Sequence, residues 1–343
     1  MISLTTLKNL FLEYRLPLVC VLFVLILLPV IAYQFTTKNN KNTSKVIQIK
    51  RPIDIPQKTL GVKISYTGQK INLPKKISVF TQDSSAINPP QASLYAKALS
   101  IEGEPKKLSP GSETYVLTSN NTTLLFSLIS PMLEIKKSNI KSGQNNDAAS
   151  APQKLMGLLT KLGININAQI SKTPDIQNLK QVILDPEKKT PINADFMQLS
   201  FSQSIDQLPV ITQNPNTHPL RGTFLFGEIQ NLEIDLGIQN IPIKGKEEKT
   251  IDLSKILKLV EGGGGIFLSA DNPEEYAVAL GKSKAINYIE LKNSQVAYYK
   301  NLTDKVEFIP VVLFTGTVKF ENQESRNVRI ITPLISNYTL TQP

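Results

Sequence analysis

The sequence has almost none of the residues on which metal sites and nucleophilic catalysis usually depend. Among 343 residues there are one His, one Cys and no Trp. Structural zinc sites are mostly built from four Cys or His side chains, and a disulfide needs two Cys. Cys20 also lies in the most apolar stretch, so the rest of the chain has no thiol. These absences exclude thiol redox chemistry, and we expect no cofactor, no metal site and no catalytic residues.

Arginine is also scarce, although the formal net charge is +10. Only five of the 38 basic residues are Arg, whereas base and phosphate recognition relies on the two-pronged guanidinium group. The Lys residues are scattered, with no aromatic residues interleaved to stack on bases. The composition therefore predicts a solvated Lys-rich surface and no specific nucleic-acid partner. An anionic membrane surface or an anionic cell-wall polymer would suit such a surface better.

Residues 16–33 form the one long apolar run, LPLVCVLFVLILLPVIAY, with no charge in eighteen residues. As a helix it would be about 27 Å long, close to the hydrocarbon thickness of about 30 Å. The run therefore predicts a single-pass anchor that contacts membrane lipid. The anchor residues we expect are Leu16, Pro17, Val19, Phe23, Leu27 and Tyr33.

Two features of the sequence bear on whether this anchor is cleaved and on which side of the membrane the domain lies. A cleaved signal peptide would need small residues in an A-x-A-like pattern, and Ala32, Tyr33 and Gln34 do not supply one. Five basic residues follow the run and two precede it, which by the positive-inside rule favours a cytoplasmic domain. Long domains are exported largely regardless of such charges, however. We therefore predict a protein of the cell membrane with a cytoplasmic N-terminus and an extracytoplasmic C-terminal domain.

The patterns after the anchor predict an α+β fold with two small lobes of antiparallel sheet and packed helices. The expected divisions are an N-terminus with anchor (1–35), a stalk (36–74), a first lobe (75–137), a linker (138–152), a second lobe (153–336) and a tail (337–343). Helices are expected at 90–99, 153–162, 252–260 and 273–281. Strands are expected at 76–81, 113–118, 123–129, 196–205, 208–212, 223–228, 232–238, 285–291, 295–300, 307–320 and 327–334, with a turn at 292–294.

The motifs that could carry chemistry have simpler explanations. In the Gly-rich run 262–265, a dinucleotide-binding spacing would need Gly where Leu268 stands. Gly281, Lys282 and Ser283 imitate the end of a phosphate-binding loop, but Tyr276 replaces its first Gly.

Ionisable side chains offer no better case for catalysis. His218 is interpreted as a surface-loop residue. The carboxylates weighed as an acid/base pair have no spacing that places two of them on one cavity wall; they are Asp206, Glu228, Glu233 and Asp235.

Four short motifs give the second lobe a resemblance to a known family. They are FSQSIDQLPV at 201–210, the expected helix at 273–280, IEL at 289–291 leading to AYY at 297–299, and IPVV at 309–312. Their arrangement resembles the extracytoplasmic domain of the YycI and YycH regulators, and more loosely PepSY-like envelope modules. The resemblance implies a single-pass protein attached to a bacterial histidine kinase that senses cell-wall stress, and it implies no active site.

Taken together, these patterns predict a non-catalytic, membrane-anchored envelope protein that binds protein or cell-wall partners. Two alternatives stay open: a regulator of a membrane sensor histidine kinase, and an envelope hydrolase with an unrecognised carboxylate site. A cavity with two close carboxylates would favour the hydrolase. A filled core with an exposed apolar surface would favour binding.

Overall fold

The structure is a computed structural model, and it describes residues 45–48 and most of 63–341. Outside the described residues lie 1–44, 49–62, 84–85, 120, 139, 141–146, 185–190, 215–216, 263–264, 270–285, 303–305, 321–324 and 342–343. The predicted anchor at 16–33 and the predicted helix at 273–281 both fall there. Within the described part of the chain, no helix is long and apolar enough to cross a membrane.

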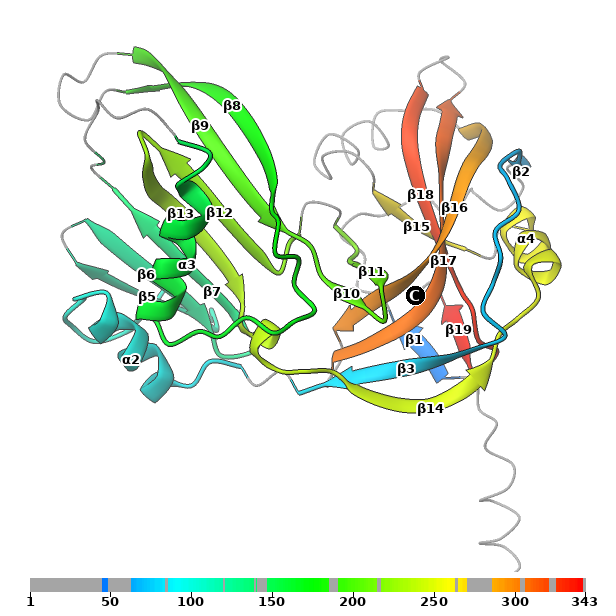
Figure 1. The fold of residues 1–343 in the computed structure, drawn as a ribbon, viewed down its shortest axis with the longest axis horizontal. Helices are drawn as coiled ribbons and strands as arrows, with labels where there is room; N and C mark the ends of the chain where they lie inside the picture. The colour runs from blue at the N-terminus through cyan, green and yellow to red at the C-terminus, as the bar shows by residue number, and fades with distance from the viewer. Residues whose placement is uncertain are drawn as a thin grey trace, which may run out of the picture. The chain divides into compact units, whose positions relative to one another are not determined.

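The first of two large sheets has eight antiparallel strands (Figure 1). In spatial order they are β4 (Lys106–Lys107), β5 (Thr114–Ser119), β6 (Thr122–Ser127), β7 (Met132–Lys137), β13 (Glu228–Asp235), β12 (Leu220–Leu225), β9 (Pro191–Phe201) and β8 (Asp175–Leu184). Most neighbours in this order are also consecutive along the chain and are joined by hairpins. One junction, between β7 and β13, pairs segments about 100 residues apart.

Two helices pack on the eight-stranded sheet, and with its strands they enclose a hydrophobic core. They are α2 (Pro89–Ala98) and α3 (Ala151–Lys161). Asn88 caps α2, because its side chain accepts a hydrogen bond from the Gln91 backbone N–H at 2.9 Å. In α3, Leu155 and Leu159 are buried one turn apart. Leu155 lies where a Cβ on Gly222 of β12 would be, so this glycine allows α3 to approach the sheet closely.

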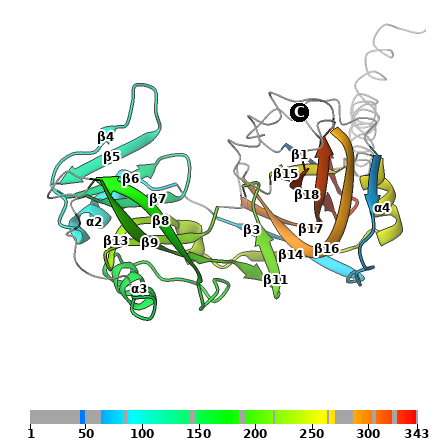
Figure 2. The same cartoon turned by 90° about the horizontal axis from the view of Figure 1, so that it is seen from above.

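The second large sheet has nine strands (Figure 1). Its main path is β10 (Ser204–Ile205), β11 (Leu208–Ile211), β16 (Ile286–Leu302), β17 (Val306–Phe320), β18 (Ser325–Pro333) and β15 (Ile266–Ser269). Off this path, β3 (Lys76–Gln82) pairs with β17 and β14 (Ile243–Lys249), and β2 (Lys63–Tyr66) pairs with β16. Helix α4 (Leu253–Glu261) lies beside β2, as Figure 2 also shows. A separate two-stranded sheet joins β1 (Lys45–Gln48) to β19 (Tyr338–Thr341).

Strand β17 forms the core of the second sheet. It pairs with β16 along its whole length and with β18 along its second half. From Val311 to Phe314 four consecutive side chains are buried, so the strand is covered on both faces. The strand predicted at 307–320 is therefore confirmed, and so are the helices predicted at 90–99, 153–162 and 252–260.

The predicted fold class is wrong. The described residues are mostly β-structure in two large sheets, with three α-helices and the short 3-10 helix η2 (Leu236–Gln239), rather than two small α+β lobes. Each sheet also takes strands from both sides of 138–152: β7 pairs with β13, and β3 pairs with β17. Local periodicity identifies single elements but carries no information on such long-range pairing.

Two local predictions also fail, for reasons of backbone geometry. The expected turn at 292–294 is a bulge between Leu291 and Asn293, where β16 continues as one strand. The expected strand at 223–228 ends at Leu225, because Phe226 and Gly227 take positive φ values of 51° and 76° in the turn to β13.

Candidate functional site

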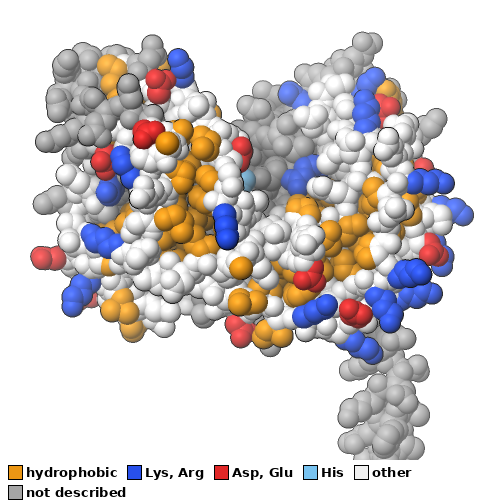
Figure 3. Space-filling view, viewed as in Figure 1, with side chains coloured by type: hydrophobic (Ala, Val, Ile, Leu, Met, Phe, Trp, Pro, Cys, Tyr) orange, Lys and Arg blue, Asp and Glu red, His pale blue; other side chains and the backbone are white. Residues whose placement is uncertain are grey.

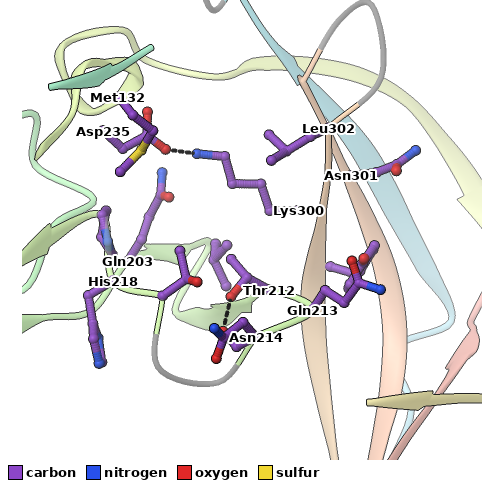
Figure 4. Close-up of a pocket in the computed structure, with 14 residues that line it drawn as sticks. Met132, Gln203, Thr212, Gln213, Asn214, His218, Asp235, Lys300, Asn301 and Leu302 are labelled. Carbon is purple, nitrogen blue, oxygen red and sulfur yellow. Dashed lines mark hydrogen bonds and ion pairs between the residues drawn. The ribbon is translucent and has the colours of Figure 1, made fainter. Parts of the chain in front are cut away.

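A cavity of about 320 Å³ opens where the ends of β7 and β13 meet β11 and β16 (Figure 4). Strand ends, the segment before β12 and the loop after β11 all contribute to its walls. It is lined by Met132, Gln203, Val210, Thr212, Gln213, Asn214, Thr217, His218, Pro219, Asp235, Tyr299, Lys300, Asn301 and Leu302. Ten of these fourteen residues have polar side chains, and the other four supply apolar walls. The cavity therefore combines polar groups with apolar surface, as ligand sites do.

A buried ion pair forms one wall of the cavity. Asp235 is the last residue of β13, and one of its carboxylate oxygens accepts a hydrogen bond from the Gly237 N–H at 2.9 Å, which caps η2. Its other oxygen accepts from the Lys300 ammonium of β16. Each residue is only 8% exposed, so the pair is shielded from solvent. The pair also joins the eight-stranded sheet to the nine-stranded sheet.

Gln203 lies beside this ion pair and is only 4% exposed. Its backbone is fixed by the hairpin of β10 and β11, since its carbonyl accepts from the Val210 N–H at 2.8 Å. Its side-chain amide points toward Asp235 and Lys300 (Figure 4). The Nε2 group has no hydrogen-bond partner among the residues that the structure describes. An unpaired buried donor costs about 1–3 kcal/mol of stability, so a structural role alone does not explain it.

His218 and Tyr299 are the remaining titratable side chains of the cavity. Burial, and next the nearby Arg221 charge, hold the pKa of His218 below its usual value, so the imidazole is neutral at pH 7. Burial raises the pKa of Tyr299, so its phenol keeps its proton. Among the described residues, Asp235 and Lys300 are the lining side chains that carry a formal charge, and these two are paired with each other.

The structure brings only one of the four weighed carboxylates to the cavity, and that one is Asp235. Glu233 accepts from Arg221 on the neighbouring strand at 2.5 Å. Glu228 is exposed, and Asp206 lies in the turn between β10 and β11 with a φ of 48°. A pair of carboxylates for acid/base chemistry is therefore not formed in this cavity.

The sequence alone assigns no site role to the four polar residues at this end of the cavity. Asp235 and His218 are candidates that it gives no functional role, Gln203 lies in the FSQSIDQLPV motif, and Lys300 ends an expected strand. One signal was present for Lys300, which follows Ala297, Tyr298 and Tyr299 at the end of a buried strand. Among the described residues, no group of three or more His, Cys, Asp or Glu could hold a metal ion.

A second feature is the edge strand β8. It pairs with β9 over ten residues, and within the described chain no strand pairs with its other edge. The side chains from Asp175 to Lys180 and that of Val182 are exposed. Three of them are large and apolar, namely Ile176, Leu179 and Val182. Hydrophobic side chains gather over the strands of this sheet in the space-filling view (Figure 3).

Comparison with known proteins gives only distant similarity. No known family matches the sequence. No curated protein is similar to it in sequence either. A crystal structure of an uncharacterized protein from Eubacterium rectale is 12% identical, covers 82% of this chain and 91% of its own, and has a TM-score of 0.49.

The structure of YycH from Bacillus subtilis is also similar to this chain. It is 15% identical, with a TM-score of 0.33, over 74% of this chain and about half (52%) of YycH. The resemblance to YycH thus has a distant structural counterpart, and the resemblance to YycI and PepSY modules stays a prediction. Both TM-scores lie below 0.5, so neither similarity establishes a function.

Proposed function

We propose that this chain is a non-catalytic envelope protein that binds a protein partner, and that the partner adds an extended strand to the free edge of β8. The observation that carries the proposal is the ten-residue edge with three exposed apolar side chains. Free edges expose unpaired backbone N–H and C=O groups, and natural proteins usually shorten or cover them. An edge of this length with exposed apolar side chains suits strand addition, in which the backbone supplies affinity and the side chains supply specificity.

The choice of binding over turnover rests on the cavity. The described part of its lining contains one carboxylate, and that carboxylate is paired with Lys300 and bonded to a backbone N–H. A glycosidase-type mechanism needs two carboxyl groups on facing walls. His218 has no buried nucleophile or carboxylate bonded to it among the described contacts. These features argue against the hydrolase alternative.

The partner strand can be tested with a photo-crosslinking amino acid placed at Val182. The matched control is the same amino acid at Leu94 on α2, since these side chains are 68% and 67% exposed. We expect one protein to be captured from position 182 and not from position 94. The captured protein is then purified, and its affinity is measured for Val182→Lys and Leu94→Lys. A loss of tenfold or more for Val182→Lys alone supports the proposal, and equal affinities contradict it.

The identity of the captured protein also separates the narrower versions of this function. A membrane sensor histidine kinase would agree with the regulatory role that the YycI and YycH resemblance implies. A second copy of this chain would mean that β8 is a self-association edge, which contradicts the partner proposal. Capture of wall polymer without any protein would contradict it as well.

Membrane attachment is part of the proposal and rests on the sequence of 16–33 alone. An uncharged run of this length predicts that the protein stays with membranes through a high-salt wash, because salt screens surface charge but not apolar insertion. Protease added to spheroplasts should then digest the domain after residue 36. Release by salt would contradict the anchor, and full protection would contradict the orientation.

A further inference from the structure

We infer that the cavity at the Asp235–Lys300 pair binds a small neutral ligand whose carbonyl oxygen accepts a hydrogen bond from the Gln203 amide. The ligand class is that of short amides, with an apolar group beside the carbonyl. This inference does not depend on strand addition at β8, which uses other residues.

The donor is the first reason for this assignment. Gln203 Nε2 is buried, has no partner in the described part of the chain, and points into the cavity (Figure 4). A ligand oxygen placed there would satisfy a group that otherwise lowers stability. The ammonium of Lys300 lies on the same side, and its bond to Asp235 uses one of its three N–H groups. The cavity thus offers hydrogen-bond donors at the place to which Gln203 points.

Charge is the second reason, because it favours a neutral ligand over an ion. The carboxylate of Asp235 already neutralises Lys300. An anion would have to compete with Asp235 for the ammonium, and the Asp235 carboxylate would repel it at close range. A cation would face the ammonium and the amide N–H groups. The neutral His218 adds no charge that would reverse this balance.

Size and lining complete the description of the ligand. The cavity volume of about 320 Å³ lies at the small end of the range for ligand sites, about 300–1,000 Å³. Met132, Val210 and Leu302 supply apolar walls near the polar end. A capped single amino acid, with one branched apolar side chain and two neutral amides, fits both the cavity volume and the arrangement of apolar walls beside a polar end.

The test uses the full-length protein in detergent, labelled with 13C at its methionine methyl groups. The chain has four Met residues, of which Met132 lines the cavity and Met156 is exposed on α3. N-acetyl-leucinamide is the neutral probe, and N-acetyl-leucine is its anionic match. We expect the Met132 resonance to shift and saturate with the amide at no more than a tenth of the concentration needed for the acid. The Met156 resonance should not move.

Two variants separate the proposed contact from general packing. Gln203→Leu removes the unpaired donor without adding a methionine signal, and we expect it to weaken amide binding at least tenfold with no loss of thermal stability. Thr332→Val is the matched control, since Thr332 is 1% exposed with an unpaired hydroxyl but does not line the cavity. It should leave binding unchanged.

Three results would each overturn the inference. The first is no Met132 shift with either probe. The second is binding of the acid at least as tight as that of the amide, and the third is equal amide binding by Gln203→Leu and the unmodified protein. The crosslinking result at Val182 is unaffected by any of them.

Discussion

Strands β17 and β8 are both long, yet they have opposite environments. β17 lies between β16 and β18, and its residues from Val311 to Phe314 are buried on both faces. Among the described strands β8 has one neighbour, and its side chains from Asp175 to Lys180 are exposed. Burial of apolar area stabilises the fold, whereas an exposed apolar edge adds no such stability and leaves backbone groups unpaired. We infer that β17 maintains the structure, whereas β8 is the strand that we propose binds a partner.

The largest difference in stability between β17 and β8 is expected when the same substitution is made on both strands. Val312→Asp places an unpaired charge at a fully buried position, and we expect a loss of about 3–5 kcal/mol in the free energy of unfolding. Val182→Asp lies at an exposed position, so its effect should stay within about 0.5 kcal/mol. Urea denaturation followed by circular dichroism measures both. Similar losses at the two positions would show that β8 is part of the core.

The next comparison concerns two ion pairs, one buried and one on β8. Lys300→Met leaves the carboxylate of Asp235 buried without its partner, and should cost about 3–5 kcal/mol. Lys180 approaches Asp195 at 3.8 Å on the exposed edge, so Lys180→Met should cost no more than about 1 kcal/mol.

A double variant tests whether the buried pair acts as a unit. Asp235→Asn with Lys300→Met should cost less than the sum of the two single changes, because no charge is then left unpaired. Additive losses in denaturation experiments would mean that Asp235 and Lys300 contribute independently.

A smaller effect is expected from pH at His218, near the start of β8. Burial, and next Arg221, lower its pKa in the folded state, while the charges of Asp175 and Glu233 act in the opposite direction. As pH falls below the unfolded value of about 6.5, the unfolded state binds a proton that the folded state does not. Stability should therefore fall between pH 7.5 and 5.5. His218→Gln should reduce this slope, and an unchanged slope would contradict the burial of His218.

The variant with the smallest expected effect on stability, Val182→Lys, should have the largest effect on partner affinity. Val182→Lys is expected to change the free energy of unfolding by less than about 0.5 kcal/mol, because the side chain is exposed. The same change places a charge on the edge, which disfavours an incoming strand. Thermal denaturation and partner affinity measured on the same sample would show the two effects separately. If Val182→Lys were destabilised, its loss of partner affinity could no longer be assigned to the edge of β8, and the proposed difference between β8 and β17 would fail.

The sequence predicted those elements whose apolar pattern is strong. The buried part of β17 was recognised because burial on both faces leaves a continuous apolar run. The Leu stripe of α3 was recognised because burial of one helix face leaves a helical periodicity. β8 and β14 were missed, since the first carries Gln, Asn and Lys between its apolar residues and the second reads IKGKEEK. An exposed edge strand has no buried face to impose alternation. The predicted α+β class failed because the pairing of distant strands leaves no local signal.

The site was harder to predict than the fold. Asp235 and Lys300 are 65 residues apart, and Gln203 reaches them only because the β10–β11 hairpin lies next to β16. Their side chains are ordinary in composition, so only the pairing of strands shows that they meet. The single Cys and the single His were readable from composition.

The most direct test of the central claim is hydrogen–deuterium exchange of the chain with and without the protein captured at Val182. Amides of β17 should be protected in both samples, because they are already paired with β16 and β18. Amides of β8 should exchange more slowly only when the partner is present. Unchanged exchange in β8 together with new protection elsewhere would contradict the assignment of this edge as the binding surface.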